Sequence, residues 1–156
     1  MMEPAFNSSG GQGPELIEVR IGEQRFAIDI MSVREIRGWT ASTPLPHAPA
    51  HVLGMINLRG AVLPVVDLGS RLGMGSTKVD ASAVVVVAHI IDRQIGLLVD
   101  AVCDILSIPE GSLQPTPEVG SGEAAGYVRG VMTTADGIVS VLSLDHIFGA
   151  EVREAA

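Results

Sequence analysis

Apolar and polar residues alternate in two short runs near the start of the chain. Residues 16–22 mix apolar with charged side chains at close to period two, and residues 24–30 place three apolar side chains on one face. Such alternation is typical of half-buried β-strands. We therefore expect two strands here, followed over residues 31–39 by a helical turn or a bend and then another strand.

A stronger signal lies in the stretch from Gly54 to Leu68, GMINLRGAVLPVVDL, in which two apolar runs flank Arg59-Gly60. This pattern predicts a β-hairpin, with Gly60 in the turn because glycine adopts positive φ at little cost. Pro64 has no N–H to donate to a ladder, so we expect its strand at the edge of a sheet or at a bulge.

The hairpin pattern occurs twice. An offset of 76 positions lays residues 52–68 over residues 128–144 without a gap, and a second offset of 69 matches parts of residues 26–36 to the chain around residue 100. The second hairpin is expected to turn at Asp136-Gly137, a common hairpin signal. Two copies of one small β unit therefore make up most of the chain.

A unit of about 65 residues buries too little surface to be stable alone, so we expect the copies to share an apolar face and fold as one body. The expected divisions are a disordered tail over residues 1–14, a domain over residues 15–149 with repeats at about 15–74 and 83–149, and a C-terminal tail over residues 150–156.

Each hairpin is followed by a short helical signal. Asp67 can cap the N-terminus of one helical turn that Gly73 ends as the C′ residue. The segment from Ser143 to Phe148, with Gly149 after it, repeats this arrangement.

Two further stretches stand out. Residues 83–91 form a valine-rich run without alternation, which is typical of a strand buried on both faces, and we expect it near the centre of the structure. Residues 109–126 hold three prolines and four glycines with hardly any apolar anchor. We expect that segment to be a disordered loop.

Composition narrows the function. Hydrophobic residues make up 47% of the chain and aromatic residues only 3%, while the formal net charge is −8 with a single lysine. There is no basic stripe for nucleic acid or anionic lipid, so we expect no nucleic-acid partner and no direct membrane insertion. A lone cysteine, Cys103, and the lack of a secretory signal place the chain in the cytoplasm.

The search for catalytic chemistry returns nothing specific. His47 and His51 have zinc-pair spacing, but a proline lies between them and no third ligand is near. Cys103 sits in an apolar run, where a small buried hydrophobe is the simpler interpretation. We therefore expect no enzyme, no metal and no cofactor. Arg59 at a hairpin tip is either a solvated surface group or an anchor for a partner.

Several motifs together resemble the CheW family of bacterial chemotaxis coupling proteins. They are FAIDI with VREI, PLP with AP, GMINLRG and PVVDL, in the first half of a match that covers about residues 15–149. The resemblance implies an all-β fold of two intertwined five-stranded SH3-like barrels with short helical turns. It also implies a non-catalytic adaptor that links methyl-accepting chemoreceptors to the histidine kinase CheA, recruited from the cytoplasm to receptor arrays.

The resemblance also assigns residues by position. Those that match the family's receptor-facing groove are Val33, Glu35, Gly54 and Arg59. The resemblance assigns the kinase-facing surface to the second barrel, where no residue matches a diagnostic motif. We expect the receptor's helical tip to lie in a groove between the barrels. The alternative function is a free-standing β-barrel module that binds a small ligand in the cleft between the barrels.

Overall fold

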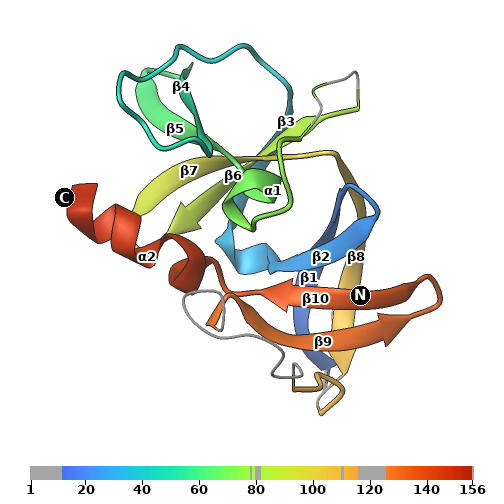
Figure 1. Cartoon of the computed structure of the whole chain (residues 1–156). Helices are drawn as coiled ribbons and strands as arrows, with labels where there is room; N and C mark the ends of the chain where they lie inside the picture. Colours follow the sequence, from blue (N-terminus) through green and yellow to red (C-terminus); the bar gives the residue numbers. More distant parts are fainter. Residues whose placement is uncertain (1–11, 78, 80–81, 110, 116–125, 156) are drawn as a thin grey trace.

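Most of the regular secondary structure in the computed structural model is β-strand (Figure 1). It describes residues 12–77, 79, 82–109, 111–115 and 126–155. The strands are β1 (Gln12–Ile21), β2 (Gln24–Asp29), β3 (Val33–Gly38), β4 (Val52–Leu58), β5 (Ala61–Asp67), β6 (Val84–Ile90), β7 (Arg93–Val99), β8 (Ala101–Pro109), β9 (Val128–Thr134) and β10 (Gly137–Leu142). The helices are the 3-10 turn η1 (Ile30–Ser32), α1 (Leu68–Arg71) and α2 (Leu144–Ala155).

The strands form two five-stranded sheets, each rolled into a small barrel. The first barrel has the order β8-β1-β2-β10-β9 and the second β3-β6-β7-β5-β4. Each contains one parallel pair, β2 with β10 and β5 with β7. Neither predicted repeat forms a barrel alone, because each barrel takes two strands from one copy and three from the other. The expected pair of intertwined barrels is confirmed.

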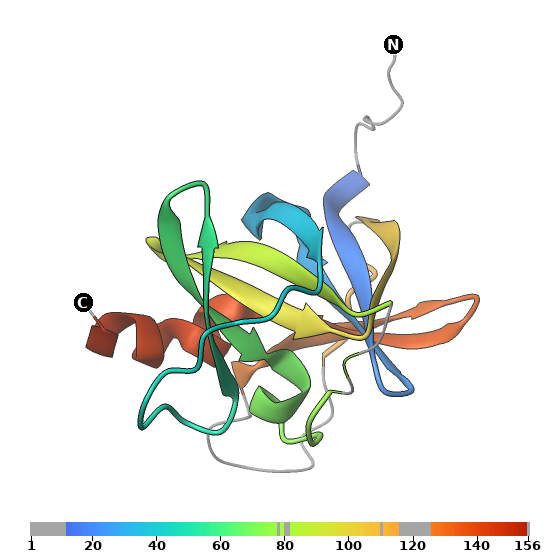
Figure 2. The same ribbon diagram turned by 90° about the horizontal axis from the view of Figure 1, so that it is seen from above.

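The two long hairpins point to different sides of the molecule, β4–β5 from the second barrel and β9–β10 from the first (Figure 2). In the first hairpin the two-residue turn is Arg59-Gly60, as predicted. In the second, Thr134 lies opposite Gly137, so the turn is Ala135-Asp136, one residue earlier than expected. Positive φ falls there on Gly137, at +125°.

The valine-rich strand β6 is buried on both faces, as predicted. Val85 and Val87 point into the second barrel, whereas Val86 and Ala88 point into a core shared by the two barrels. Its place in the sheet is between β3 and β7, so β7 is the central strand.

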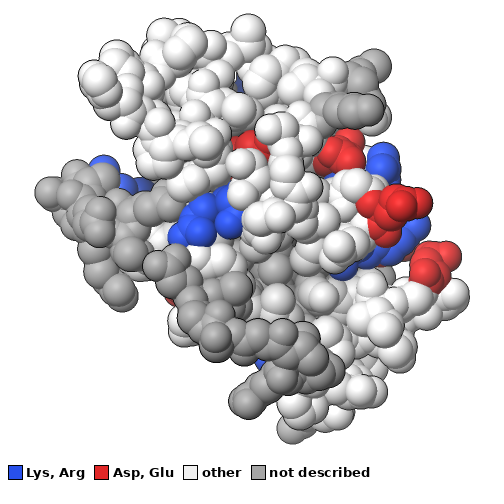
Figure 3. Space-filling model, viewed as in Figure 1, with Lys and Arg blue, Asp and Glu red and all other residues white. Residues whose placement is uncertain are grey.

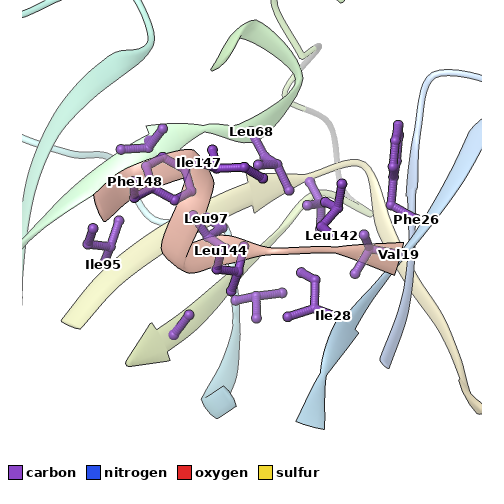
Figure 4. Close-up of a cluster of buried hydrophobic side chains, with 14 of the residues drawn as sticks. Val19, Phe26, Ile28, Leu68, Ile95, Leu97, Leu142, Leu144, Ile147 and Phe148 are labelled. Atoms are coloured by element: carbon purple, nitrogen blue, oxygen red, sulfur yellow. The ribbon is translucent and has the colours of Figure 1, made fainter. Parts of the chain in front are cut away.

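The shared core joins the barrels into one body (Figure 4). Val19, Phe26 and Ile28 come from the first barrel and Leu97 from the second. Helix α2 adds three buried side chains, those of Leu144, Ile147 and Phe148.

The helical signals have different outcomes. Asp67 caps α1 by accepting a hydrogen bond from the Ser70 N–H at 3.3 Å, and Gly73 follows the helix with φ of +82°, as predicted. Gly149 does not end α2, which continues to Ala155. The residues after it are mostly good helix formers, and one glycine costs only about 1 kcal/mol in a helix. The C-terminal tail expected from residue 150 is therefore helical to residue 155.

The start of the chain is ordered earlier than expected. Residues 1–11 of the predicted tail lie outside the described residues, but Gln12 already pairs with Pro109 in the ladder between β1 and β8.

Pro64 does not lie on an edge strand, because β5 runs between β7 and β4. Opposite Pro64 is Met55, which exchanges both its backbone hydrogen bonds with Thr43 at 2.8 Å rather than with β5. The parallel ladder with β7 begins only at Val65. Neither neighbour therefore requires a donor from Pro64.

Each barrel has a gap between its two edge strands that a connecting segment bridges. Thr43 pairs with Met55 in the second barrel, and Gln114 pairs with Val131 in the first through bonds of 2.8 and 2.9 Å. The neighbouring Leu113 packs against the first-barrel core. The prediction of a disordered loop over residues 109–126 is therefore wrong at these residues, while residues 110 and 116–125 lie outside the description. Within the described ranges, no helix is long and apolar enough to span a membrane.

Candidate functional site

Strand β3 carries two of the four predicted site residues, and a bulge separates them. Val33 lies opposite Ala88 and Glu35 opposite Val87, so Arg34 has no partner in the ladder. Because successive residues of β6 face opposite sides, Val33 and Glu35 do as well. Val33 packs against the shared core, and Glu35 lies at the mouth of the second barrel.

Arg59 occupies the tip of the β4–β5 hairpin. Its φ is +50° and that of Gly60 is +88°, as a tight two-residue turn between twisted strands requires. The Gly60 N–H donates to Asn57 Oδ1 at 3.0 Å, which fixes the turn. The Arg59 side chain is 74% exposed and donates from Nη2 to Glu35 Oε1.

Glu35 accepts from a second guanidinium on its own strand. Arg37 Nη1 donates to Glu35 Oε2 at 3.2 Å. The hydrogen bond from Arg59, and then that from Arg37, lowers the pKa of the Glu35 carboxyl, and the Glu35 contact raises the pKa of Arg59. One carboxylate thus faces two guanidinium groups. We call Glu35, Arg37 and Arg59 the mouth cluster, and its net charge is +1.

Gly54 has a different role from the mouth cluster. It is buried, its φ is +152°, and a Cβ there would lie 2.3 Å from the Thr43 carbonyl oxygen. Gly130 is its counterpart in the first barrel, where a Cβ would lie 2.6 Å from the Gln114 carbonyl oxygen. In each barrel the segment that bridges the two edge strands passes very close to the backbone of β4 or β9. Only a glycine leaves enough room at that crossing. Gly54 shapes the site through its backbone.

The four predicted residues are therefore only partly brought together. Glu35 and Arg59 are in contact, whereas Val33 and Gly54 support the strands that carry them. Arg37 was not assigned to the receptor-facing set, although its position two residues after Glu35 on an alternating strand placed it on the same face.

A groove of about 700 Å³ lies on the outer face of the second barrel. Its walls come from β4, β5, the start of β7 and the loop between β3 and β4. They are mainly apolar, with Leu45, Ala48, Met55, Val62, Pro64 and Ile95 among them. The surface over β4, β5 and that loop carries almost no Lys, Arg, Asp or Glu (Figure 3). The groove thus belongs to one barrel and does not lie between the two.

No described part of the chain gathers three or more His, Cys, Asp or Glu side chains into a group that could hold a metal ion. His47 and His51 lie on the loop between β3 and β4. Cys103 is exposed, which corrects the expectation of a buried thiol. It occupies the unpaired position of a bulge between β1 and β8, the counterpart of Arg34 on β3.

Sequence comparison decides the family. Residues 15–152 of the chain match the CheW-like domain family. The chain belongs to the CheW family. The residues of the mouth cluster come from within the matched region.

Relatives in the CheW family match almost the full chain. The chemotaxis protein CheW of Rhizobium meliloti strain 1021 is 51% identical over 144 residues, which cover 92% of this chain and 93% of that protein. The probable chemotaxis protein CheW of Rhizobium etli is 48% identical over 155 residues, covering 99% of this chain and all of that protein.

A solved structure agrees with the fold. The crystal structure of the scaffolding protein TtCheW from Thermoanaerobacter tengcongensis superposes with a TM-score of 0.79 at 29% identity, covering 87% of this chain and 92% of that one.

Proposed function

We propose that this chain is a non-catalytic adaptor that couples methyl-accepting chemoreceptors to a CheA-type histidine kinase. Membership of the CheW family supports this. The adaptor would act in the cytoplasm and be recruited to receptor arrays through its partners.

The receptor contact is assigned to Val33, Glu35, Gly54 and Arg59, with distinct roles. Arg59 and Glu35 touch the receptor, Val33 holds the start of β3 against the shared core, and Gly54 allows the bridging segment to cross β4. The observation that carries the assignment is the exposed Arg59 guanidinium, held in place by Glu35. An arginine fixed before binding loses less side-chain entropy on complex formation than a free one.

Charge reversal tests the receptor contact. Arg59→Glu places a carboxylate beside Glu35, so receptor binding should fall by roughly a hundredfold, as for loss of a charged interface anchor. The measurement is co-sedimentation with receptor-containing membranes, together with the melting temperature. The melting temperature should stay nearly constant because Arg59 is mostly exposed.

Arg129→Glu is the matched control, since Arg129 is an exposed arginine on β9 of the first barrel. It should leave receptor binding unchanged. Full receptor binding by Arg59→Glu, or equal loss in both variants, would contradict the role given to Arg59.

The kinase contact was expected on the barrel of the less family-like second half of the chain, but each barrel takes strands from both halves, so that expectation does not pick out one barrel. We assign the kinase contact to the second barrel because, with its β3–β4 loop, it carries the apolar groove and the exposed side chains of Ile36, Leu45, Val62 and Ile91. An exposed apolar surface of this kind marks protein-binding sites in other proteins. Kinase co-sedimentation with receptor membranes, with and without the adaptor, tests whether the chain links the two.

The small-ligand alternative required a cleft between the barrels. Among the described residues the centre of that position is filled by the shared core, and the pocket at its border, lined by Arg20, Gly22 and residues 74–77, has only about 290 Å³ (Figure 4). The adaptor is therefore the better-supported function.

A further inference from the structure

A small polar pocket lies in the gap between the two edge strands of the second barrel. Its volume is about 130 Å³, and its polar lining comes from Arg37 on β3, Thr40 and Thr43 on the segment that bridges the gap, and Asn57 on β4. Asn57 lies two residues nearer the hairpin tip than Met55, so the pocket is beyond the Thr43–Met55 bridge. We call it the gap pocket.

The backbone of β4 faces this pocket. Met55 exchanges both its backbone hydrogen bonds with Thr43 across the gap. Residues two apart on a strand direct their backbone groups to the same side, so the N–H and C=O of Asn57 also point into the gap. The Asn57 side chain accepts from the Gly60 N–H through Oδ1, which leaves its amide nitrogen as a further donor.

Arg37 supplies the charge of the pocket. It donates to Glu35 from Nη1 at 3.2 Å, and the other N–H groups of its guanidinium are further donors. Glu35 is shared with Arg59, so the net charge beside the pocket stays positive. Thr40 adds a hydroxyl whose contact with the Gly38 carbonyl is long, at 3.5 Å. A guanidinium, a hydroxyl and amide donors thus surround one small volume.

The first barrel fills the same gap with apolar side chains. By the repeat offset of 69, the counterpart of Arg37 is Leu106, which packs against the first-barrel core. The residue before each bridging residue differs in the same way, because it is Leu113 in the first barrel and Ser42 in the second. Leu113 also packs against the first-barrel core. A barrel of this plan therefore folds without a polar lining in its gap.

We propose that the gap pocket binds a carboxylate group through Arg37, Thr40 and Asn57. A guanidinium with converging neutral donors suits a carboxylate, because hydrogen bonds to a charged acceptor are stronger than those to a neutral one. The volume admits a group of the size of acetate and is too small for a drug-sized molecule. The carboxylate belongs either to a free small acid or to an Asp or Glu side chain of a bound protein. The pocket's own donors define this site, whether or not the chain binds a receptor.

Sodium acetate is the probe for this site, titrated into the full chain at constant ionic strength. Acetamide, which has nearly the same shape and no charge, is the control ligand. Acetate should shift the backbone amide NMR signals of Asn57 and Thr40 in a saturable way, and acetamide should not. Arg37→Gln should weaken acetate binding by about tenfold, because the charge-assisted bonds are lost.

Two further variants test the other donors. Thr40→Val removes the hydroxyl at nearly constant shape and should weaken acetate binding by about threefold. Asn57→Asp keeps an oxygen for the Gly60 N–H but replaces the amide donor with a negative charge, so it should abolish binding. Thr133→Val, at the exposed repeat counterpart of Asn57 on β9, is the matched control and should bind acetate as the unaltered chain does. Melting temperatures show whether each variant is folded.

Several results would overturn the site. They are acetate shifts at neither amide, shifts that do not saturate, and equal effects of acetate and acetamide. Equal acetate binding by the unaltered chain, Arg37→Gln and Thr40→Val would place the carboxylate elsewhere, such as on the exposed Arg59, and would also overturn it.

Receptor co-sedimentation separates the two sources of the carboxylate once acetate binds as expected. Weaker co-sedimentation of Thr40→Val would assign the carboxylate to the receptor, and unchanged co-sedimentation would assign the pocket to a free acid. If the unaltered chain binds acetate in the pocket but no receptor, the proposed function fails and the carboxylate site stands.

Discussion

The two barrels share one strand plan but place their charged groups differently. In the first, Glu18 is 4% exposed and accepts from Arg25 Nη1 at 2.9 Å, on the interior face of β1. In the second, the repeat counterparts are Val87 and Gln94, and the charges lie at the barrel mouth on Glu35 and Arg59. Charge inside the first barrel is structural, whereas charge at the mouth of the second is available to a partner.

The two barrels also differ in which residues occupy their tight turns. Positive φ in the first barrel and its loop falls on Gly22, Gly111 and Gly137, but the second barrel also places Arg59 and Ile91 at such positions. A non-glycine residue at positive φ destabilises the folded chain, and an exposed side chain there gains no packing in return unless a partner covers it. The comparison agrees with the proposal that the second barrel carries the docking surfaces and the first supports it, and four changes would break or sharpen it.

The largest effect is expected where the barrels are alike. Gly54→Ala places a Cβ 2.3 Å from the Thr43 oxygen and should lower the free energy of unfolding by about 3 kcal/mol. Gly130→Ala, with its nearest contact at 2.6 Å, should cost slightly less. Urea denaturation measures both. A neutral result at either position would show that the bridging segment does not constrain that barrel.

The next effect concerns the interior pair of the first barrel. Arg25→Gln leaves the Glu18 carboxylate buried without its partner and should lower the melting temperature by several degrees. The double variant Glu18→Val with Arg25→Gln copies the interior of the second barrel and should recover most of the loss. If the double variant is as unstable as the single one, the pair has a role beyond charge compensation.

A smaller effect tests the turns reciprocally. Gly22→Ile copies the β6–β7 turn into the first barrel and should cost about 1–2 kcal/mol, because Gly22 has open space around it and only its φ resists the change. The free energy of unfolding of Ile91→Gly should be unchanged within about 1 kcal/mol. Equal destabilisation by both would mean that Ile91 packs for stability.

The smallest effect is on protonation at the mouth cluster. The folded-state pKa of Glu35 is lowered from its usual 4.5, so the cluster's contribution is present above that value and is lost as the pH falls through the lower, folded-state pKa. Arg59→Met should raise the Glu35 pKa toward 4.5 without reaching it, because Arg37 remains. Carboxyl NMR titration measures this, with Arg129→Met as the control. An unmoved pKa would show that Arg59 does not hold Glu35 in solution.

Much of the fold could be predicted from local pattern. The Gly54–Leu68 hairpin, the Asp67 cap and the doubly buried β6 follow from spacing and turn chemistry within a few residues. The exchange of strands between barrels was implied only by the family resemblance. A repeat shows that two copies form the same strand pairs, but those pairs can be made within a copy or between copies.

The candidate site was predicted less well because of one extra residue. The bulge at Arg34 puts Val33 and Glu35 on opposite faces, and its counterpart at Cys103 exposes the thiol that the apolar run predicted to be buried. Bulges reverse the facing of every later residue and leave no clear mark in a single sequence. Pro64 was misplaced for a different reason. It can lie between two strands because Thr43, a residue outside the hairpin, takes both backbone hydrogen bonds of Met55.

The strand exchange also orders events during synthesis. All strands of the second barrel are complete once Val99 has left the ribosome, whereas β1 and β2 at the front of the chain must wait for β10, which ends at Leu142. The second barrel can therefore close first, with the unfinished β1–β2 hairpin beside it. Until translation ends, that hairpin exposes strand edges to neighbouring nascent chains.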